Sequence, residues 1–299
     1  MPSINFNVEA IDAIQLDLPT ELTSVDWMSP YVWQEGGEYL MLARAVPRPI
    51  SESNNTGAIH FGRSPDGLHF VMEATPVIAP GPGEEDIGGC EDPTLVKWNG
   101  EYVVYYTGVE SSLTSGQMLY ASGPDLRHLT KRGVAYASSK TEGNTKEATI
   151  GRTADNRWRL FFEFARDEAS LVGLAFGDGV GGPWTEREPP FGPREDSWDN
   201  WHLSTGPLLT TDPDMPVMFY NGATRDARWR IGWIAFNRDC SEVVDRCIEP
   251  MIVPNPPRER TAIDIAFAAS VVATDGKVFL YYSLADKALF RAQVVRCET

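Results

Sequence analysis

One sequence pattern recurs five times along the 299 residues: an opening segment, a loop with Gly or Asp, and an aromatic strand that ends in small or polar residues. The copies begin roughly 55 to 65 residues apart, a spacing expected of propeller blades. This repeat constrains the fold strongly, because one blade cannot bury its apolar face without its neighbours. The clearest copies of the central part are residues 33–45, 96–108, 151–165, 208–223 and 271–285.

A short alternating segment follows each copy and predicts an outer blade strand. Long periodic stretches of helix-forming residues are missing, and no linker separates the copies. We therefore expect an all-β, five-bladed β-propeller that forms one domain over residues 1–299. Two sandwiches of about 150 residues each are the rival arrangement, but they would need a change of composition near the middle of the chain. The alternating segments are residues 58–64, 117–123, 171–177, 230–236 and 288–294.

The charge balance argues against nucleic acid as a partner. Asp and Glu number 42 against 26 Lys and Arg, and the net charge of -16 is offset by no basic patch. The N-terminal segment lacks the basic and apolar regions of a signal peptide, and no run of 18 apolar residues follows. We therefore expect a cytoplasmic protein that does not bind a membrane, while its oligomeric state stays open.

The cysteines predict neither a metal site nor a redox pair. Cys90, Cys240, Cys247 and Cys297 show no CxxC spacing, so we expect buried free thiols. No metal and no cofactor are expected.

In a propeller, the inner strands of all blades reach a central channel, so function is expected at equivalent positions that open each blade. Blade two opens with GGCEDP, which places Glu91 and Asp92 before a proline that can start a strand but not continue a ladder. An Asp before Pro can also serve only local backbone donors, so this motif alone leaves both interpretations open. Blade three pairs Lys146 with Glu147, and its apolar central strand carries Glu163.

Blades four and five add aromatic and polar candidates. Trp201 and His202 lie in DSWDNWH, and Tyr282 and Asp286 lie in YYSLAD. Aromatic faces beside acids suit sugars, because apolar C–H faces stack on rings while hydroxyl groups bond to carboxylates. Paired carboxyl groups are the usual means of cleaving a glycosidic bond, and no GxSxG, HExxH or Gly-rich phosphate motif competes.

These motifs resemble those of glycoside hydrolase family 130, the mannoside phosphorylases and related β-mannosidases, over nearly the whole chain. The resemblance implies a five-bladed propeller in which Asp92 is the general acid. It further implies a sugar pocket lined by Arg44, Glu91, Lys146, Tyr282 and Asp286. The matching pieces are EDP at 91–93, NTKEA at 144–148, STGPLL at 204–209, YYSLAD at 281–286 and the arginine of YLMLARAV.

The chain departs from the family where the phosphorylases gather phosphate. Thr94 replaces the usual Arg after EDP, Glu163 replaces a basic residue, and Asn221 replaces a His. Phosphate needs cations and no base, whereas water must be deprotonated. We therefore expect an inverting glycoside hydrolase that acts on β-mannosides or a related short oligosaccharide, with Glu147 or Glu163 as the base.

Two alternatives stay open. A phosphate-dependent β-mannoside phosphorylase would require inorganic phosphate for turnover. A propeller that binds a glycan or protein partner without catalysis should lack the channel carboxylates, and this chain has them. The sugar, the linkage and the choice between Glu147 and Glu163 also stay open, because loops and the strand register determine them.

Overall fold

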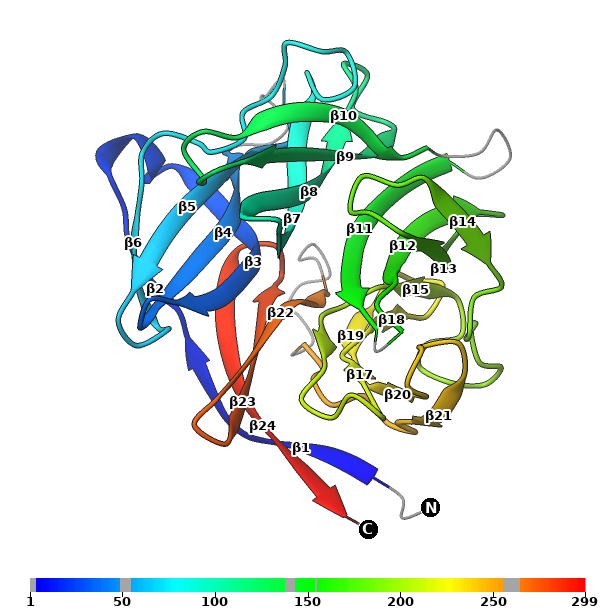
Figure 1. Ribbon diagram of the computed structural model, residues 1–299. Coiled ribbons are helices and arrows are strands. Elements are labelled where there is room, and N and C mark those ends of the chain that lie inside the picture. The colour runs from blue at the N-terminus through cyan, green and yellow to red at the C-terminus, as the bar shows by residue number, and fades with distance from the viewer. Residues whose placement is uncertain (1–3, 49–54, 138–142, 154, 255–263, 299) are drawn as a thin grey trace.

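The protein is a five-bladed β-propeller, as expected from the repeat (Figure 1). The computed structural model describes residues 4–48, 55–137, 143–153, 155–254 and 264–298. Its helical content is confined, within these ranges, to the three-residue 3-10 helix η1 (Thr20–Leu22). No helix in the described ranges could therefore cross a membrane.

Blades one to three are sheets whose main strands follow one another outwards in chain order. Blade one contains β3 (Val25–Glu35), β4 (Glu38–Pro47), β5 (Ala58–Ser64) and β6 (His69–Met72), with β2 (Gln15–Asp17) parallel to β6. Blade two contains β7 (Gly89–Trp98), β8 (Glu101–Val109), β9 (Gly116–Gly123) and β10 (Thr130–Tyr136). Blade three contains β11 (Gly143–Arg152), β12 (Trp158–Arg166), β13 (Ala169–Gly177) and β14 (Trp184–Arg187).

In blade four the strands are interrupted midway along their length, so the blade consists of two short sheets. Gly206 lies so close to the Phe219 carbonyl that an added Cβ would stand 1.8 Å from its oxygen, and Pro207 lacks a ladder donor. One sheet contains β15 (His202–Ser204), β18 (Asn221–Ala223) and β19 (Trp229–Ile231). The other contains β16 (Leu208–Leu209), β17 (Val217–Met218), β20 (Ile234–Phe236) and β21 (Val243–Arg246).

Blade five joins the two ends of the chain. It contains β22 (Ala266–Thr274), β23 (Lys277–Leu284), β24 (Ala288–Glu298) and, outermost, β1 (Ile4–Ala13). β1 pairs antiparallel with β24 from Ile4 opposite Glu298 to Ala13 opposite Phe290, which closes the ring of blades (Figure 1). The third strands are outer strands, and a further strand lies outside them: β6 outside β5, β10 outside β9, β14 outside β13, β21 outside β20 and β1 outside β24.

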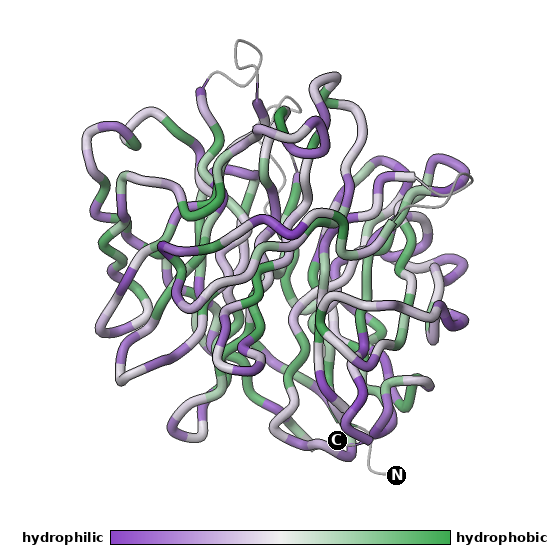
Figure 2. The backbone as a smooth tube through the Cα atoms, turned by 45° about the horizontal axis from the view of Figure 1, so that its top comes forward, coloured by the Kyte–Doolittle hydropathy of each residue, from purple (hydrophilic) through white to green (hydrophobic). Residues whose placement is uncertain are grey.

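The hydrophobic core consists of layers between neighbouring blades. Leu42 and Phe61 of blade one pack in one cluster with Val104 and Leu119 of blade two, and similar clusters join the other blades. Hydrophobic residues follow the strands while hydrophilic residues gather at the turns (Figure 2). Each blade thus buries its two faces against the neighbouring blades. This packing sets the orientation of the inner strands and therefore of the polar residues on them.

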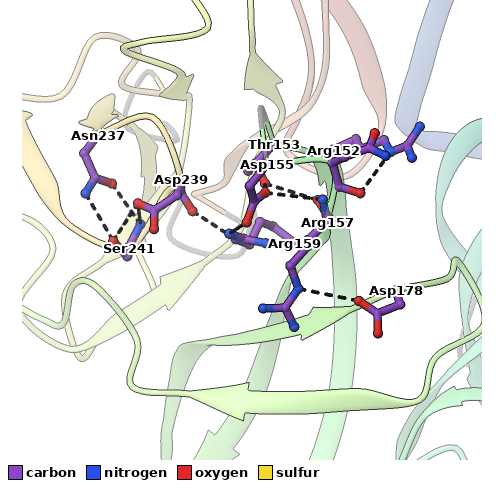
Figure 3. Close-up of polar contacts among 10 residues, drawn as sticks. Arg152, Thr153, Asp155, Arg157, Arg159, Asp178, Asn237, Asp239 and Ser241 are labelled. Carbon is purple, nitrogen blue, oxygen red and sulfur yellow. Dashed lines mark hydrogen bonds and ion pairs between the residues drawn. The ribbon is translucent and has the colours of Figure 1, made fainter.

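A buried arginine ties blade three to blade four (Figure 3). Arg159 of β12 is 1 % exposed, and its Nε donates to the Asp239 carbonyl oxygen at 2.9 Å. Its Nη2 donates to the Asp155 carboxylate at 3.0 Å, and its guanidinium carbon lies 3.6 Å from the centroid of the Phe176 ring. These contacts connect the loop between β20 and β21 with β12, β13 and the β11–β12 loop of blade three.

We expect Arg159→Met to lower the free energy of unfolding by about 1–3 kcal/mol, because Met fills the space but leaves the Asp239 carbonyl without its donor. Arg157→Met is the matched control, since Arg157 pairs at 3.5 Å with an exposed carboxylate, that of Asp178. Urea unfolding of both variants measures the difference. Equal midpoints for the two variants would contradict the role of Arg159.

Candidate active site

A β-bulge interrupts the inner strands of blades one, two and three near the same end. One residue at each bulge has a left-handed backbone: Ser29 (φ 53°), Asp92 (φ 49°) and Glu147 (φ 53°). Bulges redirect side chains, and non-glycine residues in this conformation persist only where the surrounding structure holds them. Three successive blades therefore present one polar side chain each at equivalent positions.

Prolines account for two of these bulges. Pro30 and Pro93 follow Ser29 and Asp92 directly and cannot donate a ladder hydrogen bond, so each strand is interrupted there. Asp is also among the residues that tolerate a left-handed backbone best. Glu147 has neither advantage, so its backbone conformation is strained.

Asp92 is 8 % exposed and is held by groups from blade one. The Ser29 hydroxyl donates to Asp92 Oδ1 at 2.6 Å, and Arg44 Nη1 lies 3.9 Å from the same oxygen. The Arg44 Nη2 also donates to Glu91 Oε1 at 2.6 Å. Arg44 therefore contacts both carboxyl groups of the Glu-Asp-Pro motif and fixes their position relative to blade one.

Glu147 forms a side-chain hydrogen bond with Asp92. Burial raises the pKa of Glu147 well above its usual range, the Asp92 and Glu163 carboxylates raise it further, and Lys146 opposes them. Two carboxyl groups joined in this way cannot both ionise easily. Asp92 and Glu147 therefore form a carboxyl pair in which Glu147 keeps its proton to a higher pH than an isolated glutamate does.

Lys146 and Glu163 lie opposite each other on β11 and β12. Lys146 Nζ is 3.5 Å from Glu163 Oε1, and Glu163 is 3 % exposed. The Glu163 carboxylate is the main cause of a raised Lys146 pKa, so the lysine stays charged. His202 also faces Glu163: burial lowers the His202 pKa, Glu163 opposes this, and His202 Nδ1 accepts the Ser170 N–H at 3.1 Å.

Asp286 approaches the carboxyl pair from blade five. It lies in the turn after β23 with φ 49°. Burial raises the pKa of Asp286, Arg44 and Lys146 lower it, and the Asp92 and Glu91 carboxylates raise it. The structure thus brings together seven residues predicted from the sequence. They are Arg44, Glu91, Asp92, Lys146, Glu147, Glu163 and Asp286.

Two other predicted site residues have different surroundings. Tyr282 is 3 % exposed and packs in the core on Phe290, with ring centroids 5.6 Å apart, and burial raises its pKa to about 12. Trp201 donates through Nε1 to the Glu168 carbonyl at 3.3 Å and lies under the Arg225 guanidinium. Contact of Tyr282 or Trp201 with a sugar stays a prediction.

Ser29 was not among the site residues predicted from the sequence. A serine carries no charge and gives no signal alone, but Met-Ser-Pro in blade one occupies the place of Glu-Asp-Pro in blade two. Alignment of the repeats by their X-Pro pairs could have found Ser29.

Comparisons with known proteins identify the family of this chain. The family model of glycoside hydrolase family 130, described as beta-1,4-mannooligosaccharide phosphorylase, matches residues 41–295. A 1,2-beta-oligomannan phosphorylase of Thermoanaerobacter sp. (strain X514) is 23% identical over 227 residues, which cover 75% of this chain and 73% of that protein. A beta-1,2-mannobiose phosphorylase of the same organism is 21% identical and covers 84% of both chains.

Solved structures share the propeller fold. The beta-1,2-mannobiose phosphorylase of Listeria innocua superposes with a TM-score of 0.75 at 17% identity, over 95% of this chain and 90% of that chain. Another structure, at TM-score 0.73 and 23% identity, covers 90% of this chain and 84% of its own. Its description states that the mannoside phosphorylases of this family include hydrolases of β-1,2 mannosidic linkages in Candida mannan. Because the family model spans most of its length, the chain belongs to glycoside hydrolase family 130, whose members act on mannosides.

Proposed function

We propose that this protein cleaves β-mannosidic bonds in short oligosaccharides. The carboxyl pair of Asp92 and Glu147 carries the proposal, because a carboxyl group at this place can give a proton to the glycosidic oxygen as the bond breaks. The charged groups of Arg44 and Lys146 lie around the pair and can bind the sugar hydroxyls. The names of the two curated relatives support a β-1,2 linkage, with β-1,4 as the second substrate to test.

Phosphate is the first candidate for the acceptor. The names of both curated relatives and of the family model support phosphorolysis better than the hydrolysis that the sequence favoured. In this reaction, phosphate attacks the anomeric carbon, the glycosidic oxygen leaves with the proton of the pair, and mannose 1-phosphate forms. Arg44 and Lys146 would offset part of the negative charge that phosphate brings.

Water is the second candidate, and one observation favours it. Glu163 lies beside Lys146, where its carboxylate repels an anion and can deprotonate water. Asn221 is fully buried and is committed to the backbone: its Nδ2 donates to Thr205 O at 2.6 Å, and its Oδ1 accepts from Ala268 N at 2.7 Å. The resemblance implies a histidine at this position. Here the position holds Asn221, whose side chain links the backbones of blades four and five.

A product assay on β-1,2- and β-1,4-mannobiose, with and without inorganic phosphate, separates the two reactions. Phosphorolysis predicts mannose 1-phosphate and a rate that falls at least about 100-fold when phosphate is removed, because water has no comparable site. Hydrolysis predicts free mannose at an unchanged rate. Failure to cleave either disaccharide under both conditions would contradict cleavage of these β-mannosides.

Glu163→Gln gives opposite results for the two acceptors. If Glu163 is the base of a hydrolase, kcat falls by about 10²–10⁴-fold. If phosphate is the acceptor, kcat is retained and the KM for phosphate falls, because a negative charge next to Lys146 is removed. Glu168→Gln is the control, since that carboxylate is exposed and pairs with Arg225. Unchanged kcat and KM in Glu163→Gln would remove Glu163 from both mechanisms.

A further inference from the structure

Residues 79–89 lead into the Glu-Asp-Pro motif and are held by a lysine of the outermost strand of blade two. Lys131 of β10 pairs through its ammonium group with the Asp86 carboxylate, and it donates to the carbonyl oxygens of Ala79, at 2.7 Å, and Gly81. A lysine ammonium has three N–H donors, and these three acceptors use all of them. Lys131 therefore attaches the 79–89 segment to β10 at three points.

Asp86 extends this attachment to the end of the segment. It is 2 % exposed, and its carboxylate accepts the Gly81 N–H at 3.1 Å and the Tyr106 hydroxyl at 2.9 Å. Its carbonyl oxygen accepts the Gly89 N–H at 3.1 Å. The segment is therefore a closed loop, and its last residue, Gly89, is also the first residue of β7.

Hydrogen bonds lead without a break from this loop to Arg44 in the candidate active site. The Gly88 carbonyl accepts the Thr56 N–H at 2.7 Å, and the Thr56 carbonyl accepts the Arg44 Nε–H at 3.0 Å. This contact has little room to adjust, because a Cβ added to Gly89 would stand 2.1 Å from Thr56 Oγ1. Arg44 in turn contacts both carboxyl groups of the Glu-Asp-Pro motif.

We propose that Lys131 is a positioning residue, which fixes the guanidinium group of Arg44 through the 79–89 segment and Thr56. The guanidinium is planar and its N–H groups point in fixed directions, so the bond from Nε to Thr56 determines how the other N–H groups meet their partners. Lys131 acts through these residues and takes no part in the chemistry. The kinetic consequence rests on the proposed function, in which Arg44 binds the sugar or phosphate.

A purely structural role for Lys131 is the alternative to be separated. Lys131→Met leaves the buried Asp86 carboxylate without its cation, which destabilises the fold by itself. The double variant Lys131→Met/Asp86→Asn removes both charges, and asparagine still accepts from Gly81 and Tyr106. The double variant should therefore melt closer to wild type than Lys131→Met does, although it still lacks the ammonium group that holds the segment.

The test is nitrogen-15 NMR of the arginine Nε–H groups in the substrate-free protein. The Arg44 signal is assigned by its loss in Arg44→Lys. In wild type this N–H should exchange slowly with solvent, because the side chain is 13 % exposed and Nε donates to Thr56. In Lys131→Met and in the double variant, exchange should be about tenfold faster, since the bond to Thr56 is held less firmly.

Lys97→Met is the matched control. Lys97 also belongs to blade two, and its ammonium group pairs with the Glu35 carboxylate of blade one. The pair lies near the C-terminal ends of β7 and β3, away from the bulges that carry the candidate site. This variant should leave the Arg44 signal unchanged.

The NMR experiment needs no turnover, so it stays decisive even if the protein cleaves no β-mannoside. In active enzyme, the KM of the double variant for β-1,2-mannobiose should rise about tenfold while kcat changes less than about twofold, because Arg44 binds the ground state and the transition state alike. An unchanged KM beside a faster Arg44 exchange would contradict the proposed binding role of Arg44 and leave its positioning by Lys131 supported.

Three results would overturn the positioning role. The first is an Arg44 signal that stays unchanged in Lys131→Met, or in the double variant if Lys131→Met does not fold. The second is a double variant that regains both the melting temperature and the Arg44 signal of wild type, because the effect would then be one of stability alone. The third is an equal change of the Arg44 signal in Lys97→Met.

Discussion

Asp92→Asn is expected to lower kcat by about 10²–10⁴-fold while the protein stays folded. Asparagine keeps the size of the side chain, accepts the Ser29 hydroxyl bond and tolerates φ 49°. It cannot carry the negative charge or share the proton with Glu147. Steady-state kinetics on β-1,2-mannobiose measure the loss, and a thermal melt measures the fold.

Asp275→Asn is the matched control for that substitution. Asp275 is an exposed residue of the turn between β22 and β23 and has φ 50°, so the same chemical change is made on the same backbone conformation. Its kinetics should equal those of wild type. Turnover near the wild-type rate in Asp92→Asn would remove the carboxyl pair from the mechanism.

Glu147→Gln is expected to remove activity to a similar extent and to raise thermal stability at neutral and alkaline pH. The raised pKa of Glu147 means that folded protein holds this proton more tightly than unfolded chain does. Below the usual glutamate pKa of about 4.3, Glu147 is protonated in both the folded and the unfolded protein, so its burial does not lower the free energy of unfolding. As pH rises through the raised pKa, the folded state must accept a charge between Asp92 and Glu163, and wild type loses stability.

Melting curves of wild type and Glu147→Gln at pH 4 and pH 8 test this sign. The variant should gain more at pH 8 than at pH 4, by roughly 2–4 °C for each kcal/mol relieved. Glu101→Gln, at an exposed position in β8, should change neither curve. If Glu147→Gln melted at a lower temperature than wild type at pH 8, the charge of Glu147 would not destabilise the folded protein. The same substitution thus trades stability against activity, as strained and buried functional groups commonly do.

The repeat was sufficient to predict the propeller because each blade shows its aromatic strand and turn in the local sequence. Closure was not predictable in this way. Nothing in the sequence of residues 4–13 indicates which strand they pair with. In the structure, β1 pairs with β24 near the other end of the chain. The break in blade four was also missed, since it depends on how closely Gly206 approaches the Phe219 carbonyl. That residues 1–299 form one domain stays a prediction, which limited proteolysis can test.

For the site, a sequence is most informative where a residue marks both its chemistry and its backbone. Pro93 indicated that the ladder of hydrogen bonds stops beside Asp92, but β7 does not begin there: it runs from Gly89 to Trp98 with a bulge at Asp92. Glu147 lies in a strand without a proline, so the local sequence does not indicate its left-handed backbone. Which of Glu147 and Glu163 is the base depends on the strand register, which the sequence does not determine. In the structure Glu147 contacts Asp92 and Glu163 lies beside Lys146, and the choice of base stays a prediction.

The pairing of β1 with β24 gives the biosynthesis of this protein a definite order. β1 leaves the ribosome before β24 and can obtain its partner only when β24 has emerged. Until β24 has been synthesised, β1 has no strand to pair with. The nascent chain therefore exposes the unpaired backbone groups of β1, which can pair with strands of other chains. The long interval between these strands also makes closure the contact of highest sequence separation, and hence a slow step of folding. Fusing the ends through a short linker and opening the chain at the exposed turn after β9 would turn this last contact into a local one.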